Sequence, residues 1–232
     1  MIVQAFFDFL NKQAIHAEAL YILGDLFEVW WGDDNPDPLP QRVISELHTL
    51  SKRGTALYFL HGNRDFTVAK RFAREAACTL LPEMYLMNIN KTRIELMHGD
   101  TLCIDDIKYQ KYRRIIRNPL ILWVLGKLPQ TIRRKMAAKA RSKSQQHNRN
   151  STEYIMDVND AAVRQQITRD SVDVLIHGHT HRPGRHSYEI AGKTAERIVL
   201  GDWTEQQGWF AAISAEGDVS LESFAIDTSI IS

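Results

Sequence analysis

Cysteine is nearly absent from this sequence. Its 232 residues include two, Cys78 and Cys103, which do not form a Cys-x-x-Cys pair. Two cysteines are too few for a disulfide scaffold, so we expect a protein of a reducing compartment, the cytoplasm. Long apolar runs are absent as well, because the longest, residues 120–125, is far shorter than the roughly 18 residues that cross a bilayer. The apolar first nine residues carry no basic leader, which argues against a secretory signal.

Acidic residues are missing from one long segment, residues 107–152, which we call the basic insertion. The chain has 28 Asp and Glu against 29 Lys and Arg, yet the basic insertion holds no acid. Its thirteen basic residues are Lys108, Lys111, Arg113, Arg114, Arg117, Lys127, Arg133, Arg134, Lys135, Lys139, Arg141, Lys143 and Arg149. Apolar residues alternate with these charges, which predicts amphipathic helices. Such a segment binds polyanions or an anionic membrane surface, and composition does not choose between nucleic acid, phospholipid headgroups and a phosphorylated lipid.

Elsewhere, short apolar segments alternate with helical patterns. Strands are predicted at residues 17–24, 55–60, 92–97 and 172–176, and helices at 41–53, 69–77 and 157–168. Three further segments, 197–200, 209–214 and 219–224, have the alternation of antiparallel strands completing a second sheet. The pattern predicts an α/β fold. We therefore expect one domain over residues 1–232, interrupted by the basic insertion as a helical lid.

Polar, glycine-containing turns follow the four predicted strands. They read Gly-Asp at 24–25, Gly-Asn-Arg-Asp at 62–65, His-Gly-Asp at 98–100 and Gly-His-Thr-His at 178–181. Functional clefts of α/β sheets lie beyond the carboxyl ends of the strands, so these turns are expected to converge. Aspartate, asparagine and imidazole suit Mn²⁺, Zn²⁺ or Fe²⁺, and a metal pair acidifies water and clamps a phosphoryl displacement. His61 and His177 adjoin the strands, and we expect them to be structural.

These four motifs, in this order, resemble those of the calcineurin-like metallophosphoesterases. The resemblance implies a two-sheet sandwich flanked by helices. The strings YILGDLFEVWWGDD, FLHGNRDF, MHGDTLCIDD and LIHGHTHRP are similar, more narrowly, to the lipid A pyrophosphatases. Members of that family cleave UDP-2,3-diacylglucosamine, a lipid-linked UDP-sugar, into UMP and diacylglucosamine 1-phosphate.

The resemblance also implies roles for individual residues. Asp25 would bridge two metal ions, usually Mn²⁺, with Asn63, His98 and His179 completing one metal site and His181 belonging to the other. Arg64 would stabilise charge on the pyrophosphate, because an arginine does not act as a general acid near neutral pH.

Substrate contacts follow from the same resemblance. The implied set around the glucosamine and nucleotide is Asp106, Tyr109, Arg141, Ser144 and Asn148, together with Asn63, Arg64 and His179 at the metal site. Trp30 and the apolar side chains of the basic insertion would line a cleft for the acyl chains. Ser151 departs from the family, which can have lysine there.

One family motif has no counterpart in this sequence. The superfamily opens with a strand ending in Asp-x-His, which supplies two ligands, whereas Asp8 is followed two residues later by Leu10. The expectation is a domain without its first strand, in which the second metal keeps only Asp25 and His181. A displaced start, a truncated chain and a degenerate relative would each explain this.

Three functions remain open at this stage. The leading one is hydrolysis of a lipid-linked UDP pyrophosphate by a peripheral protein on the cytoplasmic face of the inner membrane. The second is a nucleic-acid phosphodiesterase, which we do not expect because the basic insertion is rich in aliphatic residues rather than in aromatics for base stacking. The third is a non-catalytic scaffold of the same fold.

Overall fold

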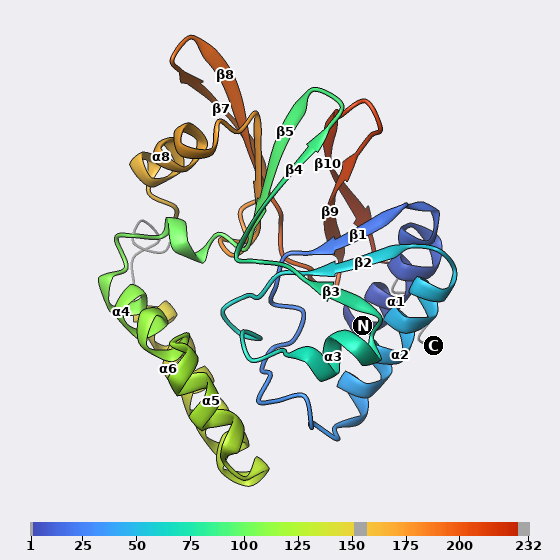
Figure 1. Ribbon diagram of the computed structural model, residues 1–232, viewed down its shortest axis with the longest axis vertical. Helices are drawn as coiled ribbons and strands as arrows, with labels where there is room; N and C mark the ends of the chain where they lie inside the picture. Colours follow the sequence, from blue (N-terminus) through green and yellow to red (C-terminus); the bar gives the residue numbers. More distant parts are fainter. Residues whose placement is uncertain (1, 151–156, 227–232) are drawn as a thin grey trace.

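The computed structural model describes residues 2–150 and 157–226. A parallel three-stranded sheet in the order β1-β2-β3 is built from β1 (Ala19–Ile22), β2 (Ala56–Phe59) and β3 (Cys78–Leu80). The helices α1 (Ile2–Lys12), α2 (Pro38–Lys52) and α3 (Lys70–Glu75) lie beside this sheet in Figure 1. A short 3₁₀ turn, η1 (Ala14–His16), connects α1 to β1. The apolar faces of α1, α2 and α3 meet the sheet in one core cluster, which explains why these amphipathic segments fold as helices there.

A second sheet has five strands in the order β4-β5-β6-β8-β7. They are β4 (Met84–Ile89), β5 (Thr92–Met97), β6 (Val174–His177), β7 (Gly184–Ile190) and β8 (Lys193–Val199). The helix α8 (Asp160–Asp170) packs on one face through Val163 and Ile167. On the other side, apolar residues of this sheet meet those of β1 and β2 in a second core cluster. The two-sheet sandwich with flanking helices is thus confirmed.

The carboxyl-terminal part differs from the expectation in one respect. Only β9 (Gln207–Ile213) and β10 (Val219–Ala225) pair antiparallel as a separate hairpin. Strand β8 instead runs parallel to β6, with Val174 opposite Glu196, and antiparallel to β7. The prediction that 197–200, 209–214 and 219–224 complete one sheet was therefore wrong, because β8 pairs with β7 and β6 in the five-stranded sheet while β9 and β10 pair with each other.

The basic insertion forms three helices that extend away from both sheets (Figure 1). They are α4 (Ile107–Ile116), α5 (Pro119–Lys127) and α6 (Gln130–Asn150). Asp106 caps α4 by accepting a hydrogen bond from the Tyr109 backbone N–H at 2.9 Å, and Asn118 caps α5 in the same way. A 3₁₀ turn, η2 (Asp100–Leu102), links β5 to this segment. The helical character predicted from the sequence is confirmed over residues 107–150.

Candidate metal centre

The turns after β1 and β2 touch through two glycines. A Cβ atom built on Gly24 would lie 2.2 Å from the Gly62 nitrogen, and one built on Gly62 would lie 2.2 Å from Oδ1 of Asp25. Any side chain at either position would therefore push the two turns apart. The Gly-Asp and Gly-Asn-Arg-Asp motifs contain glycine because their backbones must approach this closely.

His98, at the end of β5, is aimed at the centre by a backbone carbonyl. Its Nδ1 lies 2.8 Å from the oxygen of Leu23, which can only accept a hydrogen bond, so Nδ1 carries the proton. The lone pair of Nε2 then faces Asn63 Oδ1 at 2.9 Å and Asp25 Oδ2 at 3.7 Å. Three electron-pair donors converge here, and a cation is the partner that satisfies all of them.

His179 completes the group from the turn after β6. Its Nδ1 lies 3.0 Å from the same Asn63 oxygen, and one ligand atom each from Asp25, His98 and His179 lies within 4.8 Å of the other two. Burial, with a smaller contribution from His98, lowers the pKa of His179 to about 4. The ring is therefore neutral at pH 7, which is the form that binds a metal ion.

Backbone conformation sets the candidate ligands apart from most of the chain. Asp25, His179 and His181 have φ values of 55°, 66° and 57°, in the left-handed region that non-glycine residues rarely occupy. Such conformations persist where surrounding contacts hold them, and they cluster at functional sites. The strain supports a functional reading of the Gly-Asp and Gly-His-Thr-His turns.

His181 does not join the group of ligand atoms within 4.8 Å. Burial lowers its pKa, the charge of Arg64 lowers it further, and the charges of Asp202 and Asp25 oppose this shift. His181 therefore lies near Asp25 and Asp202, beside the group. The sequence reasoning did not consider Asp202, which follows β8 and carries no motif around it. As predicted, neither His61 nor His177 is in the group; their rings bond the backbone oxygens of Val68 and Gly178.

Arg64 lies against Asp25 on the open side of the centre. Its backbone N–H donates to Asp25 Oδ1 at 2.9 Å, and its guanidinium lies 3.3 Å from Oδ2 and 2.9 Å from Glu28. Arg141, from helix α6, forms an ion pair with the same Glu28. Glu28 thus joins an arginine of the core to an arginine of the basic insertion, a role that no sequence motif indicated.

Asp65 fixes the turn from behind. It is fully buried and accepts hydrogen bonds from the N–H groups of Gly62 at 2.9 Å and Leu26 at 2.8 Å. Burial, reinforced by the nearby charge of Asp25, raises the pKa of Asp65 to about 6. The last residue of the Gly-Asn-Arg-Asp motif therefore holds the two turns together.

Asp100 anchors the basic insertion to this centre. Its buried carboxylate accepts a 2.6 Å hydrogen bond from the Tyr109 hydroxyl and pairs with Arg113 at 2.7 Å and Arg117 at 3.4 Å. Although burial alone would raise it, the charges of His98, Arg117 and Arg113 hold the pKa of Asp100 well below its usual range. Sequence reasoning noted Asp100 in the His-Gly-Asp motif but missed this role; the arginines at 113 and 117, one helical turn apart, are the signal that could have found it.

The predicted substrate residues fall into three groups. Tyr109 lies near the centre, with its ring centroid 6.1 Å from that of His179, while Asp106 caps α4 and is buried. Arg141 and Ser144 lie on α6, whereas the side chain of Asn148 and the whole of Ser151 lie outside the described residues.

Trp30 requires a correction. It is 3% exposed, packs against Phe27 and Phe72, and donates to Asp33 at 3.1 Å. The loop after β1 folds back on α3 and buries this ring, so in this structure Trp30 belongs to the core and does not line a cleft for acyl chains.

Comparisons with known proteins place the chain in a family. The model of the calcineurin-like phosphoesterase family matches residues 3–183. A Yersinia enterocolitica protein named UDP-2,3-diacylglucosamine hydrolase is 49% identical over 202 residues, covering 87% of this chain and 84% of its own. A Yersinia pseudotuberculosis protein of the same name is 47% identical over 223 residues, covering 96% of this chain and 92% of its own. Among solved structures, an archaeal phosphodiesterase aligns with a TM-score of 0.48 and 11% identity, covering 96% of this chain and 92% of its own. By its family match and its relatives, the chain belongs to the calcineurin-like phosphoesterases, in the group that contains the UDP-2,3-diacylglucosamine hydrolases.

Proposed function

We propose that the chain hydrolyses the pyrophosphate bond of UDP-2,3-diacylglucosamine, giving UMP and 2,3-diacylglucosamine 1-phosphate. The observation that carries the proposal is the convergence of ligand atoms from Asp25, His98 and His179 at the base of a basic, apolar insertion. Relatives at 47% and 49% identity bear the name of this activity. A substrate with an anionic pyrophosphate and two acyl chains needs both features in one place.

The donor set fits a divalent cation of intermediate hardness. Asp25, Asn63, His98 and His179 would hold one ion, and Asp25 with His181 would contribute to a second, with Mn²⁺ as the proposed metal. Such ions, when bound, acidify water and stabilise the attacking and departing oxygens of a phosphoryl displacement. The Leu23 carbonyl keeps His98 in the required tautomer, and the turn glycines keep Asp25 next to Asn63.

Arginines stabilise the negative charge on the phosphate oxygens in this proposal. Arg64 is held at the rim of the centre by Asp25 and Glu28, and Arg141 reaches the same glutamate from the insertion. Guanidinium groups bind phosphate oxygens in pairs of parallel hydrogen bonds and stay charged at neutral pH. We propose that Arg64 binds the pyrophosphate, while Asp106, Tyr109, Arg141, Ser144 and Asn148 contact the rest of the head group.

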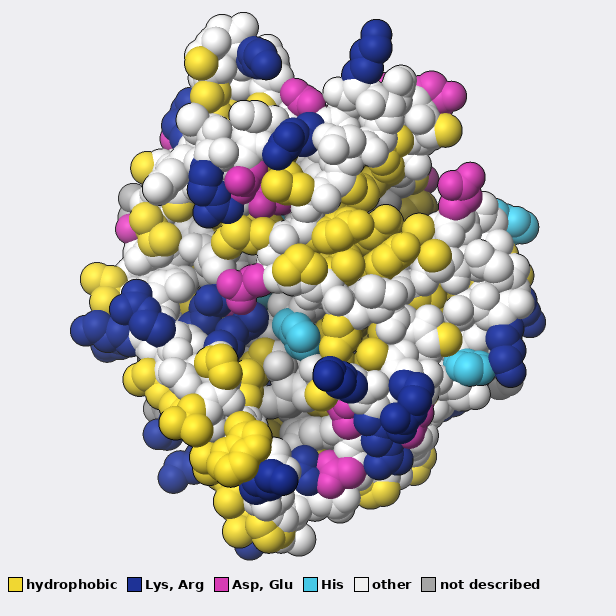
Figure 2. Space-filling view, viewed as in Figure 1, with side chains coloured by type: hydrophobic (Ala, Val, Ile, Leu, Met, Phe, Trp, Pro, Cys, Tyr) yellow, Lys and Arg dark blue, Asp and Glu magenta, His cyan; other side chains and the backbone are white. Residues whose placement is uncertain are grey.

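The exposed surface of the basic insertion suits an anionic membrane. Large apolar side chains there lie open to solvent, among them Leu120 at 68% and Trp123 at 62% exposure. Figure 2 shows apolar side chains interspersed with lysine and arginine on the lower left of the molecule, the side on which Figure 1 places α4, α5 and α6. Among the described residues, no helix has the length and apolar character needed to span a membrane. We propose peripheral binding to the cytoplasmic face of the inner membrane through this surface.

The test is a direct assay of the chain with Mn²⁺ and UDP-2,3-diacylglucosamine in anionic vesicles. UMP release, abolished by a chelator, is the expected result. In ¹⁸O-labelled water the label should enter UMP, because attack at the α-phosphorus adds the water oxygen to that phosphate. Absence of UMP would count against the proposal, and cleavage of an oligonucleotide in its place would favour the nucleic-acid phosphodiesterase.

A further inference from the structure

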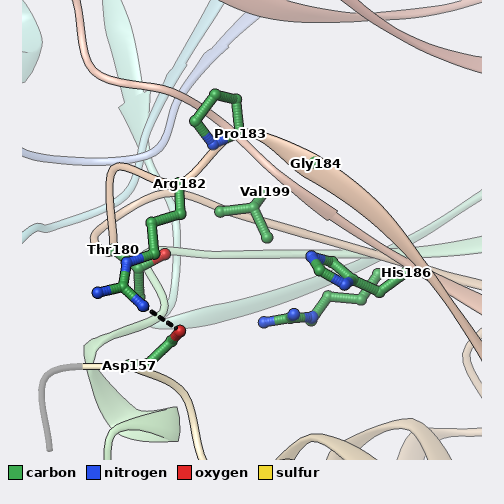
Figure 3. Close-up of a pocket in the computed structure, with 8 residues that line it drawn as sticks. Asp157, Thr180, Arg182, Pro183, Gly184, His186 and Val199 are labelled. Atoms are coloured by element: carbon green, nitrogen blue, oxygen red, sulfur yellow. Dashed lines mark hydrogen bonds and ion pairs between the residues drawn. The ribbon is translucent and has the colours of Figure 1, made fainter. Parts of the chain in front are cut away.

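A cavity lies next to the Gly-His-Thr-His turn. It measures about 190 Å³, and its lining includes Asp157, Thr180, Arg182, His186, Arg197 and Val199. Figure 3 shows Thr180, Arg182 and Asp157 on one side and His186 on the other, with Val199 between them. None of the candidate metal ligands lines it. The cavity is many times larger than the roughly 10–15 Å³ that a single water molecule requires, so a ligand of several atoms fits.

The unusual member of this lining is Arg197. It stands in strand β8, in register with Leu175 of β6 and His186 of β7, and it is 7% exposed. Its Nε and Nη1 atoms are buried and have no hydrogen-bond partner among residues 2–150 and 157–226. A guanidinium does not lose its charge in a protein, so its burial without an acceptor carries a large desolvation cost.

A second unpartnered group lines the same cavity. The hydroxyl oxygen of Thr180 is buried and likewise lacks a hydrogen-bond partner among the residues that the structure describes. Native proteins leave few buried polar groups unsatisfied, and two such groups on one cavity point to a ligand that bonds both.

The charge of the cavity indicates the sign of that ligand. Among the residues that the structure describes, Asp157 is the one acidic residue of the lining, and it forms a 2.7 Å ion pair with Arg182. Arg197 adds a positive charge that this pair does not balance.

We propose that this cavity binds a small oxyanion, a phosphate or a carboxylate, held by the guanidinium of Arg197 and the hydroxyl of Thr180. Planar guanidinium donors match pairs of phosphate or carboxylate oxygens, and the threonine hydroxyl can donate to a third. Because Thr180 lies between His179 and His181, an anion here would contact the turn that carries two candidate metal ligands. The inference goes beyond the proposed hydrolysis and does not depend on it.

The test measures thermal unfolding of the whole chain, stripped of metal beforehand on a chelating resin, in a buffer without phosphate or carboxylate. Inorganic phosphate should raise the melting temperature of the wild type in a saturable way, because it binds the folded state only. Arg197→Met removes an unpaired buried charge, so its melting temperature should exceed that of the wild type before phosphate is added. Phosphate should then leave the Arg197→Met variant unchanged, while Arg197→Lys should bind it about tenfold to a hundredfold more weakly.

Two variants serve as matched controls. Arg185→Met removes an arginine of the adjacent strand β7 that is already paired with Glu196, and its response to phosphate should equal that of the wild type. His98→Ala disables the metal centre and should also keep the full response, which separates this proposal from the proposed hydrolysis. If Arg197→Met fails to fold, Thr180→Val provides the same comparison, with an expected several-fold loss of phosphate affinity.

A parallel titration with acetate distinguishes the two chemical classes of anion, phosphate and carboxylate. A stronger response to phosphate assigns the cavity to phosphate groups, and a stronger response to acetate assigns it to carboxylates. A wild type that responds to neither anion would overturn the proposal, as would an equal response of the wild type and Arg197→Met.

Discussion

The turns that hold the candidate ligands and the basic insertion are built in opposite ways. In the turns, glycines allow backbone contact, three residues adopt left-handed conformations, and the Leu23 carbonyl fixes the orientation of His98. In the insertion, Leu120, Trp123 and many lysines are exposed, and the attachment depends on a few arginines paired with core carboxylates. Metal chemistry requires ligands placed to a fraction of an ångström, whereas capture of a lipid requires exposed apolar and basic surface. Precise ligand placement and exposed binding surface are therefore properties of separate segments of this chain.

The largest effect should come from the turns. Asp25→Ala removes the carboxylate that lies beside His98 and Asn63, so turnover should fall by roughly 10⁴-fold or more, since residues of a catalytic unit act together. UMP release per chain and bound Mn²⁺ measured by atomic emission report the two consequences. Asp160→Ala, which removes an exposed carboxylate of α8, is the matched control and should keep both values. Full activity of the Asp25→Ala variant would contradict the assignment of the centre.

The second prediction concerns the joint between the two regions. Asp100→Asn leaves Arg113 and Arg117 without their buried anion, and loss of one partner of a buried ion pair costs about 3–5 kcal/mol. Urea unfolding should show that loss, and limited proteolysis should cut within residues 107–150 sooner than in the wild type. Glu83→Gln tests the exposed partner of the same two arginines and should cost less than about 1 kcal/mol. Equal losses in the two variants would show that Asp100 does not anchor the insertion.

Sequence reasoning performed differently in these two regions. The strands that end in motif turns were predicted closely, β5 with identical bounds, because a buried apolar run followed by glycine and a charged residue is a strong local signal. The grouping of Asp25, Asn63, His98 and His179 followed from the same logic and the family resemblance. Strand β7 was missed because it is an edge strand with one buried side chain, Tyr188, so its sequence has no alternation to detect.

What could not be predicted depends on contacts between distant segments. The burial of Trp30 follows from packing against Phe72, about forty positions away, and nothing in the Trp-Trp-Gly string announces it. The anchor formed by Asp100 joins a strand end to a helix that the composition described only as basic. Local sequence patterns thus predict the position of a side chain within a helix or strand. Its contact partner depends on how the helices and strands pack together.

Burial also predicts how the packed region responds to pH. Glu95 of β5 is completely buried, and burial raises its pKa to about 7, although a 2.6 Å hydrogen bond from Gln166 opposes this shift. Between the unfolded pKa near 4.5 and the folded value near 7, the folded state binds the proton and the unfolded state does not. Unfolding free energy should therefore fall as pH rises through this window, by at most roughly 1.4 kcal/mol per pH unit, and level off above it.

Glu95→Gln removes that titration while keeping the shape of the side chain. Urea unfolding at a series of pH values should show that the free energy of unfolding of this variant depends less on pH. The variant should therefore become more stable relative to the wild type as pH increases from 5 to above about 7. Glu189→Gln, a change at an exposed glutamate of β7, controls for the loss of one negative charge. Parallel profiles for the wild type and Glu95→Gln would show that Glu95 does not titrate in this range.

The smallest effect should arise at the exposed tip of the insertion. Trp123 is 62% exposed on α5, with the Lys127 ammonium 5.7 Å from its ring centroid, so apolar and cationic groups face solvent together. Burial of such a side chain in a membrane interface contributes about 1.5–3 kcal/mol, and Trp123→Gln should weaken binding to anionic vesicles about tenfold to a hundredfold without changing the melting temperature. Leu39→Gln, an exposed apolar position of α2 outside the insertion, should leave vesicle binding unchanged. If vesicle sedimentation shows the same affinity for the wild type, Trp123→Gln and Leu39→Gln, the exposed apolar surface is not the membrane contact. The basic insertion would then not have the membrane-binding role that distinguishes it from the turns.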